Sequence, residues 1–315
     1  MPNVILKAVT RTQGCTMAIK DGTVAPRHFD LSFEEVPVLI HAFRRMVRAL
    51  EFDVSEMAFS TYLCARAHGV PFTALPVFLV RGFHHAAIVR GADSASTDPR
   101  ELEGRRVGVN RGYTVTTGVW ARGILADQYG VDLEKVTWVR SGDEHVAEYQ
   151  PPSNVVPLEP GGDMAGMVAA AELAAGIGIT AAGRADLAPL IPDPEEAGYA
   201  ALRDRGFYPI NHLLVVRDDV LARYPDLAAD LFFAYAEAKN QYVARLRAGI
   251  AGPDANDLMY GRVMEMTGAD PLPFGIAPNR PMIEQLMEYV VSQHILDKPF
   301  AVDELFAAGT HDLTA

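Results

Sequence analysis

The sequence predicts a two-lobed α/β fold in which the second lobe interrupts the first. The chain has 315 residues, a length at which about two domains are expected. Strand-like and helix-like patterns alternate along it, which is typical of α/β proteins. A loop-like stretch of short and charged residues at 91–103 separates two series of such patterns. We therefore expect residues 1–95 and 205–315 to form the first lobe and residues 96–204 the second, with two crossing segments and a cleft between the lobes.

The first lobe is expected to begin with a β-α-β rhythm. A helix over Val38–Leu50 is predicted because its apolar residues recur at helical spacing and its basic residues take the other face. The other elements predicted in this lobe are strands at Val4–Val9, about 29–36, Asp53–Met57, Thr73–Val80 and His85–Arg90, and a helix from about Ser60.

The second lobe repeats this pattern. Gly104–Val109 is predicted to form a strand, residues from about Thr114 to Tyr129 a helix, and Val136–Val139 another strand. A proline-rich stretch follows at 151–160. A strand around Phe207–Arg217 then leads into a largely helical carboxyl-terminal third, so that the chain is expected to return to the first lobe.

Composition argues against several classes of function. A net charge of −12 disfavours a nucleic-acid surface, which needs a basic face. Cys15 and Cys64 lie far apart, so they indicate neither a disulfide framework nor a Cys-x-x-Cys metal site, and both are expected to be reduced.

The sequence also bears on location. No stretch reaches the roughly 18 uncharged apolar residues of a membrane helix. The amino terminus reads directly into a strand without a secretory signal, although a chain trimmed of its signal would look the same. We therefore expect a cytoplasmic protein that binds no membrane, and a homo-oligomer is left open.

The first lobe carries a candidate anion site at a predicted helix start. Glu56-Met-Ala-Phe-Ser60-Thr61 runs from a strand into a helix, so that hydroxyls and backbone N–H groups collect at a helix amino terminus. Anions bind readily at such a place. The alternative is ordinary helix capping by Ser60 or Thr61.

The second lobe carries a similar device. Asn110-Arg-Gly-Tyr113-Thr-Val-Thr116 also turns from a strand into a helix, and Arg111 can add a bidentate clamp. Because ligands collect outside the carboxyl ends of strands in open α/β sheets, opposed anion sites from two lobes would suit a dicarboxylate. The alternative for Arg111 is a surface arginine in a turn.

Arg81-Gly-Phe-His84-His85 is the densest group of cationic and titratable side chains in the chain, and it is our main site candidate. Adjacent histidines on a strand would point to opposite faces, so at most one is expected to reach a given cavity. His212 opens a strand in the other crossing region and could approach this cluster. A structural role for either adjacent histidine is the alternative.

No cofactor is expected. A divalent metal at His84, His85 and His212, with Glu56, is kept as a minor alternative, but no His-x-His, His-Glu-x-x-His or Cys-x-x-Cys spacing supports it. No complete dinucleotide fingerprint, Walker sequence or Gly-x-Ser-x-Gly elbow is present.

The chain resembles a known family, the 4,5-dihydroxyphthalate decarboxylases, over most of its length. The resemblance implies a type 2 periplasmic-binding-protein-like fold that serves as an enzyme. It rests on Glu51-Phe-Asp-Val-Ser-Glu-Met-Ala-Phe-Ser-Thr-Tyr-Leu63, Arg81-Gly-Phe-His-His85, Gly104-Arg-Arg-Val-Gly-Val109, Trp120-Ala-Arg-Gly-Ile-Leu125 with Asp127-Gln-Tyr-Gly-Val131, and most distinctively Asp270-Pro-Leu-Pro-Phe-Gly-Ile-Ala-Pro-Asn-Arg-Pro281 with Val302-Asp-Glu-Leu-Phe306.

The resemblance implies a carboxy-lyase of phthalate degradation that acts on a small aromatic dicarboxylate. The expected reaction is non-oxidative decarboxylation of 4,5-dihydroxyphthalate to protocatechuate and CO2. Direct loss of CO2 would leave an aryl carbanion in the ring plane, so the ring carbon has to be protonated first. Histidine suits that proton transfer because its ordinary pKa lies near neutral.

We assign roles on this basis. His85 and His212 are predicted to transfer protons, with Glu56 orienting a histidine. The predicted substrate contacts are Arg81 and Arg111 for the spectator carboxylate, Ser60, Thr61 and Thr116 as hydrogen-bond donors, and His84 and Tyr113. The family pattern reads Arg-x-Phe-Arg-His where this chain has His84, so an imidazole replaces a cation and substrate preference could differ.

Two other functions remain open from the sequence. The first is a non-catalytic binding or sensor protein for aromatic carboxylates on the same fold, which the fold alone does not exclude. The second is a different enzyme of this fold, such as the menaquinone-pathway or pyrimidine-synthesis relatives.

Overall fold

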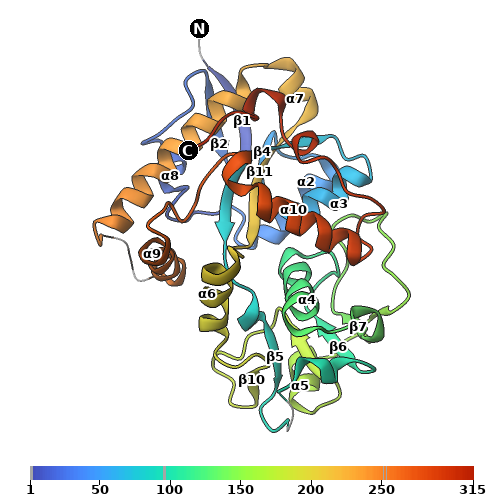
Figure 1. The fold of residues 1–315 in the computed structure, drawn as a ribbon. Coiled ribbons are helices and arrows are strands. Elements are labelled where there is room, and N and C mark those ends of the chain that lie inside the picture. The colour runs from blue at the N-terminus through green and yellow to red at the C-terminus, as the bar shows by residue number, and fades with distance from the viewer. Residues whose placement is uncertain (1–2, 95–96, 251, 253) are drawn as a thin grey trace. The chain divides into compact units, whose positions relative to one another are not determined.

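The structure, a computed structural model, describes residues 3–94, 97–250, 252 and 254–315. It divides into two compact units, each with its own sheet (Figure 1). The first unit is formed by Met1–Gly82, Ile210–Gln285 and Phe300–Ala315, and the second by Phe83–Pro209 and Leu286–Pro299. Both units combine strands with helices, which confirms the predicted α/β class.

The division falls at other residues than the sequence indicated. The expected boundary between residues 95 and 96 lies outside the described residues. Residues 83–94 join the second unit because strand β5 (Ile88–Gly91) pairs with strands of the second sheet. Leu286–Pro299 joins it because Tyr289 packs edge-on against Trp120 within that unit.

The first unit is built on a five-stranded sheet with the order β2-β1-β3-β11-β4. β1 pairs in parallel with β2 and β3, whereas β11 runs antiparallel to both β3 and β4. The register between β11 and β4 shifts around His212, as at a β-bulge. The strands are β1 (Val4–Val9), β2 (Phe29–Phe33), β3 (Val54–Ala58), β4 (Phe72–Arg81) and β11 (Ile210–Arg217).

Helices cover this sheet. The predicted amphipathic helix is present as α2, which buries Leu39, Phe43 and Met46 and contacts β3. Helix α3 contacts β3 and β11, and α8 contacts β4 (Figure 1). The α-helices that begin in this unit are α1 (Met17–Lys20), α2 (Leu39–Ala49), α3 (Phe59–Ala67), α7 (Asp218–Arg223), α8 (Leu227–Arg247), α9 (Ala255–Thr267) and α10 (Ile276–Ser292); 3-10 turns lie at Val302–Leu305 and Ala308–Thr310.

The second unit is built on a six-stranded sheet with the order β10-β5-β9-β6-β7-β8. Strands β9, β6, β7 and β8 are parallel, and β5 runs antiparallel to β9 and β10. Besides β5, the strands are β6 (Arg106–Val109), β7 (Thr137–Arg140), β8 (Val155–Pro157), β9 (Ala175–Ile177) and β10 (Leu187–Pro189).

One element of the second unit differs from its prediction. The strand expected at His85–Arg90 begins only at Ile88, because residues 85–87 form a 3-10 turn. The rule that adjacent side chains alternate across a strand therefore does not apply to His84 and His85. The helices are α4 (Thr116–Tyr129), α5 (Met164–Ala169) and α6 (Pro194–Arg205), with 3-10 turns at His85–Ala87, Pro99–Leu102 and Leu133–Lys135.

Two further features bear on predictions from the sequence. Within the described ranges, no helix is long and apolar enough to cross a membrane. Cys15 and Cys64 are both buried, and neither is in a disulfide within the described part of the chain. Burial raises the pKa of the Cys15 thiol to about 12, so this cysteine is a poor nucleophile at neutral pH.

Candidate functional site

The predicted site residues of the first unit gather at one end of its sheet. Strands β1, β3 and β4 end there and β11 begins there. Thr10 directly follows β1, Ser60 follows β3 in the first turn of α3, Arg81 is the last residue of β4, and His212 lies near the start of β11. In open α/β sheets this end of the strands is where ligands bind.

The centre of this group is a hydrogen bond between Glu56 and His212. The two residues sit on neighbouring antiparallel strands, where His212 is paired with Ala58, so Glu56 is its diagonal neighbour on the same face. The distance from Glu56 Oε1 to His212 Nδ1 is 2.6 Å. The carboxylate side chain is fully buried, whereas the imidazole is 14% exposed. Only the imidazole is therefore within reach of a ligand.

The other oxygen of Glu56 is held by the loop after β1. Its Oε2 accepts one hydrogen bond from the Thr10 hydroxyl and one from the Arg11 backbone N–H, each 2.8 Å long. Burial acts to raise the pKa of Glu56, but the hydrogen bond and charge of His212, with the Arg11 amide, outweigh it and lower that pKa. The carboxylate is therefore ionised at neutral pH.

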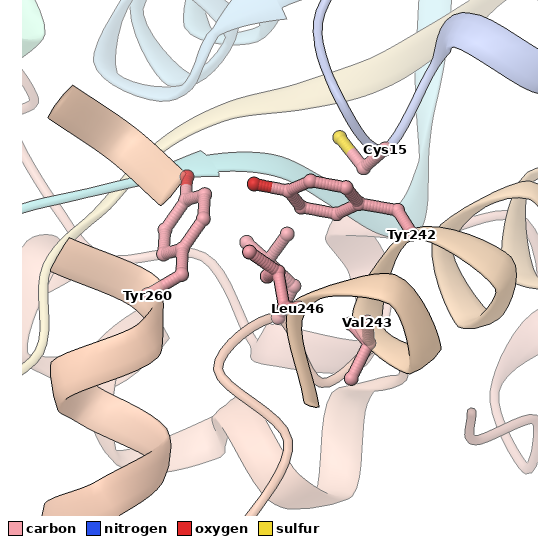
Figure 2. Close-up of a cluster of buried hydrophobic side chains, with 6 residues drawn as sticks. Cys15, Tyr242, Val243, Leu246 and Tyr260 are labelled. Atoms are coloured by element: carbon pink, nitrogen blue, oxygen red, sulfur yellow. The ribbon is translucent and has the colours of Figure 1, made fainter. Parts of the chain in front are cut away.

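The loop that donates to Glu56 is itself anchored on a buried cluster. Figure 2 shows Cys15 beside Tyr242 of α8, with Leu246 next to the tyrosines. Tyr242 donates a hydrogen bond to Asp257 at the start of α9. This packing holds the loop against α8 and α9, which fixes the two donors on Glu56.

Ser60 and Thr61 are both buried in the first turn of α3. Ala58 occupies the capping position of this helix and makes no side-chain capping bond. Neither hydroxyl is therefore a helix cap, which was the alternative to a ligand contact. Their role as substrate donors stays a prediction.

Arg81 is buried at the end of β4. Its Nη1 donates to the side-chain Oδ1 of Asn279 at 2.9 Å. The backbone N–H and C=O of Arg81 both lie 3.4 Å from the hydroxyl of Tyr260. Figure 2 shows Tyr260 reaching from α9 with this hydroxyl directed towards strand β4. Arg81 is thus held at its backbone and at its side chain.

In the second unit, His84 and His85 are both buried where the 3-10 turn begins. His85 Nε2 lies 2.9 Å from Gln128 Oε1, and its Nδ1 has no hydrogen-bond partner among the described residues. Burial lowers the pKa of His85, although the bond to Gln128 acts in the opposite direction. His85 is therefore a neutral imidazole at neutral pH.

The predicted anion site at the start of α4 is occupied by a side chain of the protein. Glu144 Oε1 accepts from the Tyr113 N–H at 2.6 Å, and its Oε2 accepts from the N–H and hydroxyl of Thr114 at 3.0 and 2.7 Å. A side chain at position 112 would collide with this carboxylate, which explains Gly112. The amides that the sequence offered to a ligand anion are thus satisfied internally.

The remaining predicted residues of this loop differ in exposure. Arg111 is exposed, in a left-handed backbone conformation with φ of 74°, and its backbone N–H donates to Ser141 Oγ at 2.8 Å. Tyr113 is buried, with the Arg122 guanidinium 3.8 Å from its ring centre. Thr116, the first residue of α4, is buried as well. Of these three, only Arg111 presents its side chain to solvent.

The metal alternative concerns residues of both units. His84 and His85 belong to the second unit and His212 to the first. Across the part of the chain that the structure describes, no group of three or more histidine, cysteine, aspartate or glutamate side chains is placed to hold a metal ion.

Comparison with known proteins finds two similar proteins that carry the same name. No family model matches the chain. A protein of Comamonas testosteroni named 4,5-dihydroxyphthalate decarboxylase is 27% identical over 281 residues, which cover 84% of each chain. A protein of the same name from Pseudomonas putida is 34% identical over 144 residues, covering 43% of this chain and 55% of that protein. The chain is a relative of these decarboxylases.

Solved structures extend the comparison to the fold. A Candida albicans protein described as having the generic periplasmic binding protein fold matches with a TM-score of 0.57 and 12% identity, over 96% of this chain and 93% of that one. The periplasmic aliphatic sulphonate binding protein of Escherichia coli matches with a TM-score of 0.55 and 11% identity, over 97% and 92%. The periplasmic-binding-protein-like fold predicted for this relative of the decarboxylases is confirmed.

Several residues of the site were not predicted from the sequence. Thr10 and Asn279 contact Glu56 and Arg81 from far along the chain, and Glu144 reaches the residues just before α4 from a loop. Thr10 was the easiest to find, because it directly follows the first predicted strand, where ligand-binding loops begin. Asn279 lies in the Asp270–Pro281 segment, which was noted only for its resemblance to the family.

Proposed function

We propose that this chain is a non-oxidative decarboxylase, a carbon–carbon lyase that converts 4,5-dihydroxyphthalate to protocatechuate and CO2. Two relatives named for that activity support the reaction class. The observation that carries the assignment of residues is the 2.6 Å hydrogen bond between Glu56 and His212. It joins a buried ionised carboxylate to a partly exposed imidazole, the arrangement in which a histidine is oriented for proton transfer.

The chemistry requires a proton at the ring carbon that bears the departing carboxylate. Protonation there, with loss of the proton from the hydroxyl para to that carbon, gives a dienone. The carbon–carbon bond to the carboxylate then breaks, its electron pair restores the aromatic ring, and the phenolate oxygen regains a proton. The net change replaces one ring carboxylate by hydrogen and releases CO2.

The hydrogen bond to Glu56 determines which ring nitrogen of His212 transfers the proton. An ionised carboxylate only accepts hydrogen bonds, so Nδ1 of His212 must carry the hydrogen that faces Glu56 Oε1. Nε2 is then the atom that gives the proton to the ring carbon in the imidazolium form and recovers one afterwards. The negative charge of Glu56 stabilises that imidazolium.

Arg81 is assigned to the carboxylate that stays on the ring. A cation that gripped the departing carboxylate would stabilise the substrate more than the transition state and would oppose the reaction. Ser60 and Thr61, in the same unit, are assigned to the polar substituents of the ring as hydrogen-bond donors.

For the second unit, we propose the roles that the sequence predicted. Arg111 is a second carboxylate ligand, with His84, Tyr113 and Thr116 as further substrate contacts. For His85, the unbonded Nδ1 is the atom that would exchange a proton. A cytoplasmic location also remains a proposal.

The test is to incubate the purified protein with 4,5-dihydroxyphthalate, with and without a chelator, and to follow protocatechuate and CO2. We expect both products in equal amounts, and activity that survives chelation. Binding of 4,5-dihydroxyphthalate without products would instead identify a non-catalytic binding or sensor protein. Activity that disappears on chelation and returns with a divalent metal would support the metal alternative.

A further inference from the structure

The side chain of Asn279 forms a fixed link between Arg81 and the carboxyl-terminal part of the first unit. Asn279 lies in the first turns of α10 and is fully buried. Its amide oxygen accepts from Arg81 Nη1 at 2.9 Å. Its amide nitrogen donates to the backbone carbonyls of Pro273 and Gly275, both at 2.8 Å. Among the described residues, these three hydrogen bonds of the amide all lie within the first unit.

These contacts fix the orientation of the amide. The two carbonyl groups can only accept, so the NH2 group has to face them and the oxygen has to face the arginine. Aspartate has the same shape, but it would present an acceptor to two buried carbonyls. A carboxylate would also place a negative charge against the guanidinium, whereas the amide adds no charge there.

The turn that carries the two carbonyls is itself firmly placed. Gly275 has a φ of 103°, its N–H donates to the carbonyl of Pro76 on β4 at 2.8 Å, and a side chain there would collide with the Leu313 carbonyl. Phe274 exchanges backbone hydrogen bonds with Ala315. The turn is thus tied to the same strand that ends in Arg81.

Asp270 anchors the beginning of this segment. It accepts a hydrogen bond from the backbone N–H of Leu272 at 2.7 Å and forms an ion pair with the fully buried Lys239 of α8. The segment from Asp270 to Pro281 is therefore held in place at both ends. It places the neutral amide oxygen of Asn279 against Arg81.

We propose that Asn279 is a positioning residue, which orients the Arg81 guanidinium and thereby makes the protein selective for aromatic rings that keep a carboxylate after the reaction. This inference rests on the proposed function of Arg81 as the ligand of that carboxylate. It assigns a role in substrate selection to a residue that is 198 positions away from Arg81 in the sequence.

The test is a double-mutant cycle on Arg81→Ala and Asn279→Ala, read as KM and kcat for 4,5-dihydroxyphthalate and as inhibition by protocatechuate and by catechol, which has no carboxylate. We expect Asn279→Ala to raise KM and the protocatechuate inhibition constant by about tenfold or more, with a smaller change in kcat and an unchanged catechol constant. The double variant should resemble Arg81→Ala alone, because the second change removes nothing that remains.

Asn154→Ala is a matched control, because Asn154 also donates to two backbone carbonyls, those of Leu133 and Val136, but its side chain bonds to no arginine among the described residues. It should lower the melting temperature without changing the ratio of the two inhibition constants. That ratio is measured on one sample and does not depend on the fraction folded. If Asn279→Ala does not fold, Asn279→Ser replaces it in the cycle.

Two results would overturn the inference. Additive losses in the double variant, or equal weakening of protocatechuate and catechol, would mean that Asn279 only supports the fold. In both cases the wild-type protein would still form protocatechuate from 4,5-dihydroxyphthalate. If the wild type neither bound nor converted that compound, the proposed function would fail, and this inference with it.

Discussion

Two buried glutamates, one in each unit, show how similar local chemistry can serve different ends. Glu56 and Glu144 each accept hydrogen bonds at both carboxylate oxygens near the end of a strand. Glu144 accepts from two backbone N–H groups and a hydroxyl of a single loop, so this carboxylate holds the chain in place. One donor to Glu56 is the imidazole of His212. A carboxylate that faces a titratable, partly exposed partner can take part in proton transfer, whereas one that faces amides cannot.

The largest effect that separates the two is expected at Glu56. Glu56→Gln should lower kcat, measured below the melting temperature of the variant, by about a hundredfold or more, because the neutral amide neither fixes the tautomer of His212 nor stabilises its imidazolium. Glu172→Gln, at an exposed glutamate, is the control and should leave kcat unchanged. A Glu56→Gln protein of wild-type turnover would contradict the role of Glu56.

The effect of pH on the same group has a definite sign. The pKa of Glu56 in the folded protein lies below its ordinary value of 4.5. Its contribution to stability is therefore present above pH 4.5 and is lost as the pH falls through the lower, folded-state pKa. Urea unfolding of wild type and Glu56→Gln across acidic pH should show a steeper loss of stability in the wild type.

Arg81 should affect binding more than chemistry. Arg81→Ala is expected to raise KM for 4,5-dihydroxyphthalate by about ten- to a hundredfold, since it removes charge-assisted hydrogen bonds to a carboxylate that does not react. Steady-state kinetics measures the division, and kcat should change less than KM. If binding and turnover were lost to the same extent in both Arg81→Ala and His85→Ala, the proposed division of roles would be contradicted.

Glu144 should affect stability rather than turnover. Glu144→Ala leaves the N–H groups of Tyr113 and Thr114 without their partner, which should cost about 1–3 kcal/mol in the free energy of unfolding. Chemical denaturation measures this, and kcat measured below the unfolding temperature should remain near that of the wild type. A large loss of kcat in a folded Glu144→Ala protein would remove the contrast with Glu56.

The smallest effect concerns His85. Its pKa in the folded protein is lowered from the ordinary 6.5, so the unfolded chain takes up this proton first as the pH falls. The free energy of unfolding should therefore decrease as the pH falls below 6.5, and His85→Asn should weaken that dependence. His41→Asn, at an exposed histidine, is the matched control and should leave the dependence intact. An unaltered dependence in His85→Asn would argue against the buried neutral imidazole.

The elements with a clear hydrophobic period were predictable from the sequence. β1 was predicted with its observed bounds, and α2 and β4 to within two residues, because their apolar residues repeat at helix or strand spacing. β9 and β10 have three residues each, too few for alternation to identify them. The 3-10 turn at residues 85–87 was not predicted, because the short apolar run after His85 also fits a strand.

The site was predictable only in part, for a different reason. Glu56, Ser60, Arg81 and His212 stand where predicted strands begin or end, so their positions followed from the pattern. Their partners did not. Thr10 and Glu56 are separated by 46 residues, and Arg81 and Asn279 by 198, so these pairs depend on strand order and register, which no local pattern contains.

The most direct test of His212 as the proton carrier compares turnover and binding in His212→Gln. The equilibrium dissociation constant of 4,5-dihydroxyphthalate and the rate of protocatechuate formation should be measured on the same preparations of wild type and variant. We expect the dissociation constant to change by less than about threefold while the rate falls by about 10²–10⁴-fold, the usual contribution of general acid–base catalysis. A His212→Gln protein that binds the compound and forms protocatechuate at the wild-type rate would contradict the mechanism.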